Sequence, residues 1–298
     1  MVKNVVQSEK LNFKGGMSLI NYKTKNIALP VTDKSPFDQN GVQFVWLGQS
    51  GFLFVVDGYF ILVDPYLSNF LEENEEGLPY SHKRLMENLL DESLYKKIDL
   101  FIASHDHPDH IDPQLVKDLA KINEKVIFAA PAGCYTLLKE LGVKEEKIVK
   151  LSPKERFTFK NCLTIESFPA AHPVADFNSE SVKALSYKFS FGSKNILFAG
   201  DTTVYPKWSE WVANSTWTLM LLPVNGRDPI KEANGIVGNM NLLEAIAVAL
   251  KNRATLLGTH YDMFAFNTIE YDEAKEVFKN FNLEDEFDLT KSGLLYSL

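Results

Sequence analysis

The stretch that decides the fold is Ile98–Ile122, IDLFIASHDHPDHIDPQLVKDLAKI. It opens with Ile98–Ser104, a short apolar run of the kind that forms a buried strand. A polar loop follows, and Asp112 and Pro113 then supply an N-cap and a first helical position for a helix. Strand, loop and helix in this order are typical of an α/β sheet, in which functional sites gather where strands end.

The polar loop holds three histidines within six residues, His105, His107 and His110. Imidazole and carboxylate groups are the ligands of Zn²⁺ and related transition metals. His105 and His107 lie two apart on an extended segment, so both can chelate one ion. Asp109 and His110 lie beyond the bend at Pro108 and can face a second ion. The spacing HxHxDH therefore predicts a dense metal-ligand loop.

Further ligands are expected at three other strand ends. His172 follows the strand CLTIESF, Asp201 follows NILFAG, and His260 follows ATLLG. A sandwich of two sheets would bring these ends to one edge, and a two-metal hydrolase needs such additional ligands together with a bridging carboxylate. Taken alone, each histidine would more often be a structural hydrogen-bonding group, and Asp201 a turn or cap residue. A structural zinc is disfavoured because neither cysteine lies near the cluster.

Outward from this stretch, the pattern of strands and helices repeats. FLFVVDGYFILVD and YKFSFGSKNILFAGD each predict a hairpin whose second strand ends in an aspartate, Asp64 and Asp201. We predict an α/β fold, a four-layer α/β/β/α sandwich with two similar halves, each a mixed sheet with helices on its outer side. A helix is expected over Lys83–Lys96, with the remaining histidine, His82, on the surface near its start. Residues 1–40 are predicted to be an N-terminal arm or lead-in strand, and residues 41–298 a single domain.

Composition limits the classes of function. The 298 residues include 31 basic and 39 acidic side chains, which give a formal net charge of −8. This balance argues against binding to a nucleic-acid backbone but allows a small anionic substrate. No signal-peptide pattern is present, and the apolar runs are far shorter than the roughly 20 residues that span a bilayer. We expect a cytoplasmic protein with a small-molecule substrate, no membrane partner and buried free thiols at Cys134 and Cys162; homo-oligomeric assembly is compatible with the sequence.

The motif HDHPDH, the later His172, the Asp201 in GDT and His260 resemble the metal-binding motifs of the metallo-β-lactamase superfamily, from about Gly41 to the C-terminus. The resemblance implies the metallo-β-lactamase fold and hydrolytic activity. It also implies two ligand sets: His105, His107 and His172 for the first metal, Asp109, His110 and His260 for the second, and Asp201 bridging both. Asp64 in LVDP matches an early aspartate that orients the histidine loop instead of binding metal.

A narrower resemblance concerns LGQSGFLF, ASHDHPDHID and LLGTHYDMF, which are similar to the L-ascorbate-6-phosphate lactonase branch of the superfamily. Its members are cytoplasmic and manganese-dependent, and they open a lactone ring on a phosphorylated sugar acid. That branch has no clear counterpart of His172, which this chain carries. Five imidazoles suit zinc, whereas the resemblance points to manganese. We therefore expect two divalent ions, zinc or manganese, with a single ion as the alternative.

The expected activity is metal-dependent hydrolysis, in which metal-bound hydroxide attacks a lactone or ester carbonyl. An anionic small molecule, such as a phosphorylated sugar acid, is the candidate substrate. Asp109 and Asp201 are the candidate catalytic residues, and Asp109 would lie close enough to the attacking water to handle its proton. Arg227 is a candidate for binding an anionic group of the substrate, with a surface arginine in a turn as the equal alternative. Tyr261, next to His260, is a further substrate-binding candidate. Two rival functions stay open: a small-molecule phosphodiesterase or phospholipase of the same fold, and a non-catalytic metal-binding sensor or binding protein.

Overall fold

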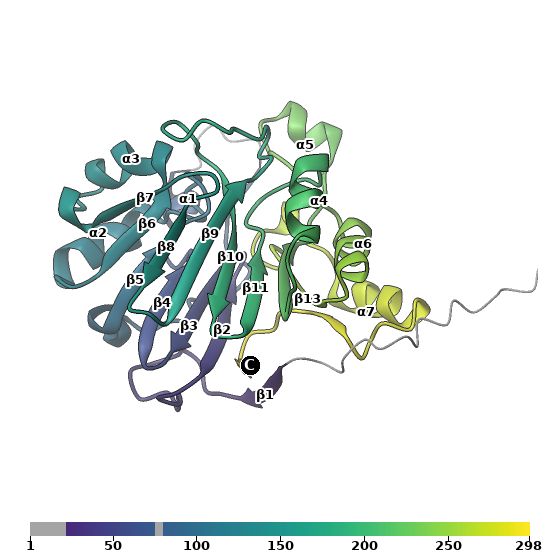
Figure 1. Ribbon diagram of the computed structural model, residues 1–298, viewed down its shortest axis with the longest axis horizontal. Helices are drawn as coiled ribbons and strands as arrows, with labels where there is room; N and C mark the ends of the chain where they lie inside the picture. Colours follow the sequence, from purple (N-terminus) through teal and green to yellow (C-terminus); the bar gives the residue numbers. More distant parts are fainter. Residues whose placement is uncertain (1–21, 75–79) are drawn as a thin grey trace, which may run out of the picture.

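The computed structural model describes residues 22–74 and 80–298, and within them the strands form two sheets (Figure 1). The first sheet has the order β1 (Lys23–Asn26), β15 (Leu294–Ser297), β2 (Val42–Gly48), β3 (Gly51–Val56), β4 (Tyr59–Val63), β5 (Ile98–Ile102), β6 (Ile127–Pro131) and β7 (Ile148–Leu151). The second has the order β14 (Phe287–Leu289), β13 (Thr255–Thr259), β12 (Leu219–Pro223), β11 (Lys194–Phe198), β10 (Leu185–Phe191), β9 (Leu163–Pro169) and β8 (Arg156–Phe159).

Helices cover the outer faces of the two sheets (Figure 1). The α-helices are α1 (Phe70–Glu73), α2 (Pro113–Ile122), α3 (Tyr135–Glu140), α4 (Pro206–Ala213), α5 (Pro229–Ala233), α6 (Leu242–Asn252) and α7 (Tyr271–Asn280). Short 3₁₀ helices are η1 (Glu92–Lys97), η2 (Ala132–Cys134), η3 (Glu145–Lys147) and η4 (Ala265–Asn267). In Figure 1, α2 and α3 flank the first sheet, whereas α4, α6 and α7 flank the second.

The two halves repeat one pairing scheme. The strands β2 to β7 pair antiparallel twice and then parallel three times. The strands β9 to β14 follow the same order of pairings. The predicted four-layer sandwich with two similar halves is thus confirmed.

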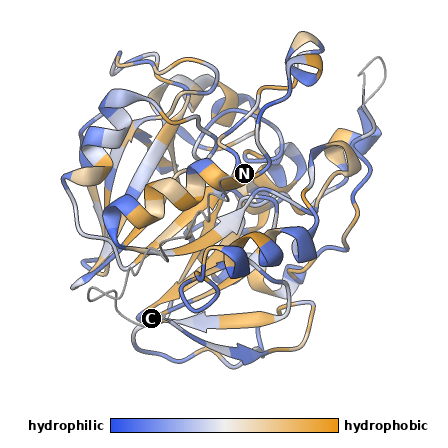
Figure 2. Cartoon of the chain, turned by 90° about the vertical axis from the view of Figure 1, so that its right-hand side faces the viewer, coloured by the Kyte–Doolittle hydropathy of each residue, from blue (hydrophilic) through white to orange (hydrophobic). Residues whose placement is uncertain are grey.

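Both faces of the central strands are buried, which explains their nearly continuous apolar sequences. Phe52 and Phe54 point between the sheets, where their rings lie 6.2 Å from Phe198 and 6.1 Å from Phe189. Leu53, which alternates with them, belongs to the core under α2 on the opposite face. Figure 2 shows hydrophobic residues concentrated in the strands and hydrophilic residues on the outer helices.

The predicted helix over Lys83–Lys96 is wrong. Within that span only η1 is helical, and the preceding backbone bonds to other segments: Leu85 N–H donates to the Met263 carbonyl, and the Leu89 carbonyl accepts from Val31. Tertiary contacts have overridden the helical pattern of this segment.

The remaining predictions concern the N-terminus, the cysteines and the membrane. Residues 1–21 of the expected arm lie outside the described residues, and β1 pairs antiparallel with β15. Both cysteines are free thiols, but only Cys134 is buried, and Cys162 is partly exposed. No helix in the described part of the chain is long and apolar enough to cross a membrane.

Candidate metal centre

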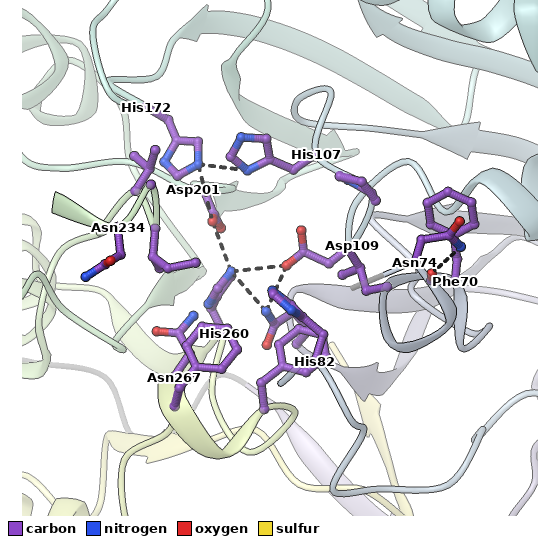
Figure 3. Close-up of a pocket in the computed structure, with 18 residues that line it drawn as sticks. Phe70, Asn74, His82, His107, Asp109, His172, Asp201, Asn234, His260 and Asn267 are labelled. Carbon is purple, nitrogen blue, oxygen red and sulfur yellow. Dashed lines mark hydrogen bonds and ion pairs between the residues drawn. The ribbon is translucent and has the colours of Figure 1, made fainter. Parts of the chain in front are cut away.

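The candidate site lies where strands of both sheets end (Figure 3). His105, His107, Asp109 and His110 occupy the loop between β5 and α2, so the first sheet supplies four of the side chains. His172, Asp201 and His260 follow β9, β11 and β13 of the second sheet. The structure therefore brings all seven predicted ligand residues together.

One group of ligand atoms comes from His105, His107 and His172, which lie within 4.8 Å of one another. The Nε2 atom of His172 is 3.2 Å from Nδ1 of His107. Nε2 of His105 is buried and has no hydrogen-bond partner in the structure. Three imidazole nitrogens thus converge on one point, as a nitrogen-rich metal site requires.

A second group consists of Asp109, His110 and His260, whose ligand atoms also lie within 4.8 Å of one another. Oδ2 of Asp109 is 3.6 Å from Nε2 of His110 and 3.8 Å from Nε2 of His260. This triad combines one carboxylate with two imidazoles. It can hold a second divalent ion beside the first.

Asp201 lies between the two triads. Its Oδ2 is 2.9 Å from Nε2 of His260 and 3.8 Å from Nε2 of His172, which belong to different triads. Its Oδ1 is 3.6 Å from Nε2 of His110 and has no hydrogen-bond partner. A carboxylate in this position faces both triads at once.

Asp64 holds the histidine loop from behind. Its fully buried carboxylate accepts a hydrogen bond from Nδ1 of His110 at 2.6 Å and one from the backbone N–H of Ser104 at 2.6 Å. The Ser104 hydroxyl also donates to Asp64 and lies 2.9 Å from Nδ1 of His105. Asp64 and Ser104 occupy the Nδ1 sides of both rings, so each Nε2 is left facing the site.

The electrostatics favour neutral, ligand-ready rings at two positions. Burial, together with the neighbouring imidazoles, lowers the pKa of His105 well below its ordinary value. Burial lowers the pKa of His172 to about 4. At His110, burial lowers the pKa, but three neighbouring carboxylates outweigh that effect and raise the pKa to about 10. The nearby histidines also hold the pKa of Asp201 well below its usual range although the carboxylate is buried.

The donor atoms fit a divalent metal centre. Nε2 of His105, Nε2 of His110 and Oδ1 of Asp201 are buried polar atoms without a hydrogen-bond partner in the structure. Such atoms are costly unless something binds them. A set of five imidazoles and two carboxylates matches the ligand preference of zinc and related transition metals. Metal ions would satisfy these atoms together.

Gln49 is a residue of this site that the sequence analysis missed. Its side-chain amide donates to Oδ2 of Asp109 at 2.9 Å and lies 3.3 Å from Nε2 of His260. The backbone N–H of His260 in turn donates to the Gln49 carbonyl at 2.9 Å. The segment LGQSGFLF, which contains Gln49, carries part of the family resemblance, but the resemblance assigns this glutamine no role. Nothing local marks this glutamine, because its role arises from the contact between two distant loops.

His82 was predicted to be a surface residue near a helix start, and this prediction is wrong. The side chain is buried and lines the cavity in front of the metal centre. Its ring packs edge-on against Phe264 and Phe266 at centroid distances of 5.3 and 5.0 Å. Arg84, two residues further on, forms an isolated antiparallel bridge with Phe264.

The two predicted substrate-binding residues lie outside the cavity lining. The guanidinium group of Arg227 forms an ion pair with Glu244 at 2.6 Å, which favours the surface-arginine alternative. Tyr261 is buried, stacks on Trp46 at 5.3 Å, and donates its hydroxyl to the Thr290 carbonyl. Tyr261 therefore packs the core behind His260 and does not face a substrate.

Two triads of candidate metal ligands face one carboxylate at the strand ends of an α/β/β/α sandwich, an arrangement typical of the metallo-β-lactamase fold. The family described as the β-lactamase superfamily domain matches residues 59–261 of this chain. The chain therefore belongs to the β-lactamase superfamily.

Relatives within the superfamily differ in activity. The chain is 24% identical over 254 residues to a metal-dependent hydrolase of Hyperthermus butylicus, covering 84% of this chain and 97% of that protein. It is 24% identical over 268 residues to an N-acyl-phosphatidylethanolamine-hydrolyzing phospholipase D of Caenorhabditis elegans, covering 84% and 72%. It is also 24% identical over 203 residues to a probable L-ascorbate-6-phosphate lactonase of Salmonella choleraesuis, covering 61% and 56%.

Solved structures support the fold. A possible metal-dependent hydrolase from Veillonella parvula superposes with a TM-score of 0.70 at 14% identity, over 87% of this chain and all of that one. At this identity the likeness concerns the fold alone.

Proposed function

We propose that the chain is a two-metal hydrolase that cleaves a lactone or carboxylic ester. The observation that carries the proposal is the position of Asp201 between two triads of inward-facing ligand atoms. His105, His107 and His172 would hold one ion, Asp109, His110 and His260 the other, and Asp201 both. The ions would supply Lewis-acid activation of water and of the substrate carbonyl.

The residues of this chain would prepare that chemistry in three ways. Asp64 and Ser104 fix the His105 and His110 rings through their Nδ1 sides. Asp109 points into the cavity (Figure 3), and its carboxylate would take the proton of an attacking water. The Gln49 amide orients that carboxylate.

Phosphodiester hydrolysis is the second candidate, because a relative that aligns with 84% of this chain is named as a phospholipase D. The same donor set would serve it, since two-metal sites also stabilise the oxygens of an in-line phosphoryl displacement. The metal content measured by mass spectrometry also tells whether the metal is zinc or manganese.

Metal content is the first measurement. For protein purified without added metal or chelator, we expect about two zinc or manganese ions per chain by mass spectrometry. His107→Ala and Asp201→Ala should each lose metal and ester hydrolysis together while the circular dichroism spectrum is kept. His82→Ala is the matched control for metal content, which it should keep, because His82 lines the cavity but belongs to neither triad. Full turnover by metal-free His107→Ala would contradict the proposal.

A further inference from the structure

A cavity of about 480 Å³ opens in front of the metal centre (Figure 3). One wall consists of the candidate ligands His107, Asp109, His172, Asp201 and His260. The opposite walls come from α1, from the segment around His82, from the loop after α5 and from η4. Their apolar members are Phe70, Leu71, Ile236, Val237, Phe264 and Phe266.

The apolar wall contains a cluster of packed aromatic rings. Phe264 and Phe266 stack with their ring centroids 5.8 Å apart and an angle of 7° between the rings. Tyr80 stacks on Phe266 at 5.1 Å, and His82 packs edge-on against both phenylalanines. Packed aromatic rings form a preorganised surface, so binding an apolar group there would cost little ordering of the protein.

No lysine or arginine is among the described residues that line this cavity. Two arginines in the surrounding segments are engaged elsewhere. Arg227 pairs with Glu244. Arg84 donates to the carbonyls of Tyr66 and Ser68 at 3.0 Å each. A phosphate or carboxylate group placed away from the metal centre would meet no lysine or arginine among the described lining residues, whose polar members there are His82, Asn74, Asn234 and Asn267.

We infer that the substrate is an uncharged lactone or ester with an aliphatic or aromatic substituent, and that Phe70 and Phe266 select it. This inference rests on the proposed function and replaces the phosphorylated sugar acid expected from the sequence. The substituent packs between α1 and η4, and the carbonyl lies at the candidate metal centre. Specificity then has two sources. The apolar substituent is buried beside the metal centre, and no lysine or arginine among the described lining residues is available to pair with an anionic group.

A series of δ-lactones tests the inference, because the bond to be broken is the same throughout. We compare δ-valerolactone, δ-octalactone and δ-decalactone with 6-phosphoglucono-δ-lactone, using the protein as purified with its metal. We expect kcat/KM to rise by up to about fourfold for each methylene that the cavity buries. The phosphorylated lactone should be the poorest substrate. A preference for the phosphorylated lactone, or no dependence on chain length, would overturn the inference.

Two variants assign the effect to the apolar wall. Phe266→Asp and Phe70→Asp should each flatten the dependence of kcat/KM on chain length while the metal content stays at the wild-type value. Phe281→Asp is the matched control: it is 58% exposed, at the end of α7, and lines none of the cavity. Chain-length dependence that survives both cavity substitutions would refute the assignment.

A binding measurement distinguishes failure of the proposed hydrolysis from failure of the proposed apolar selectivity. The ketone 2-octanone has a carbonyl and a hexyl tail but no bond that can be hydrolysed. Saturation-transfer NMR should detect its binding to the wild type and to Phe281→Asp, and weaker binding to Phe266→Asp. If no lactone is hydrolysed but this pattern holds, the proposed reaction fails and the apolar selectivity stands. If lactones are hydrolysed and the ketone does not bind, the inference fails alone.

Discussion

Gln49 links two loops of the candidate centre, the histidine loop after β5 and the loop after β13. Its backbone lies in the left-handed region, with φ of 51°, which turns the chain between β2 and β3. That turn presents the carbonyl to the His260 N–H, while the side-chain amide reaches Asp109. Both contacts involve the triad of Asp109, His110 and His260. Groups that orient metal ligands in this way commonly change metal affinity or activity by 10–100-fold when removed.

We expect Gln49→Ala to weaken that triad selectively. The substitution removes the hydrogen bond to Asp109 and leaves the backbone contact to His260 in place. During titration with a chelator, one of the two ions should leave at a chelator concentration about 10- to 100-fold lower than in the wild type. Gln43→Ala is the control, because Gln43 is also buried but bonds to Asp38 and Ser297 far from the site. Equal retention of both ions in Gln49→Ala would show that the amide does not position Asp109.

At the scale of the element, helix α2 fixes the end of the histidine loop. Asp112, its N-cap, is fully buried and accepts hydrogen bonds from the backbone N–H groups of Gln114 and Leu115. The same carboxylate accepts from Leu67 N–H at 2.9 Å and from Ser68 N–H at 2.8 Å. One carboxylate thereby ties the start of α2 to the chain that follows β4.

Asp112→Ala should therefore destabilise the protein by roughly 3 kcal/mol, more than the loss of an ordinary cap, because several buried N–H groups lose their acceptor. Urea unfolding measures the change in the free energy of unfolding. Asp228→Ala supplies the comparison: Asp228 caps the short helix α5 through Ile230 and Lys231 only, and its loss should cost about 1 kcal/mol. Equal costs for the two substitutions would refute the tethering role of Asp112.

Elements marked by local chemistry were predictable from the sequence. Asp57-Gly58 signals the β3–β4 hairpin, and Asp112-Pro113 marks the start of α2. The helix predicted over Lys83–Lys96 does not form, because much of this segment bonds to residues distant in sequence. There the Arg84 side chain donates to the carbonyls of Tyr66 and Ser68, and no local signal reveals such partners. The position of β15 between β1 and β2 is likewise set by pairing across the whole chain.

At the scale of the whole molecule, hydrogen bonds connect the two sheets beside the candidate site. Leu185 N–H of β10 donates to the Ser104 carbonyl at 2.9 Å, and the Tyr187 hydroxyl donates to the Ala103 carbonyl at 2.6 Å. The ligands at strand ends could be predicted from the sequence, because parallel strands place their carboxyl ends at one edge of a sheet. It could not yield the cavity lining, since His82 and Phe264 meet only through the packing of loops from both halves.

Gly200 lies at this junction, directly before Asp201. Its φ is +58°, and a Cβ added there would meet Ser104 Cβ at 2.6 Å and Ser104 Oγ at 2.8 Å. Ser104 is the residue that links Asp64 to the His105 ring. Close approach of the two sheets therefore needs a glycine at this position for its backbone conformation and also for space.

Gly200→Ala tests whether sheet packing sets the metal geometry. The substitution adds the strain of a left-handed backbone and a steric clash with Ser104, so we expect a loss of about 2–4 kcal/mol in unfolding free energy. Displacement of Ser104 and Asp201 should also lower metal stoichiometry in the folded protein. Gly192→Ala isolates the backbone contribution, because Gly192 has nearly the same φ, +59°, with nothing within 4 Å of an added Cβ. It should cost only about 1 kcal/mol and keep both ions. If the two variants lost the same stability and metal, backbone strain alone would account for Gly200, and the spacing of the sheets would not control the site.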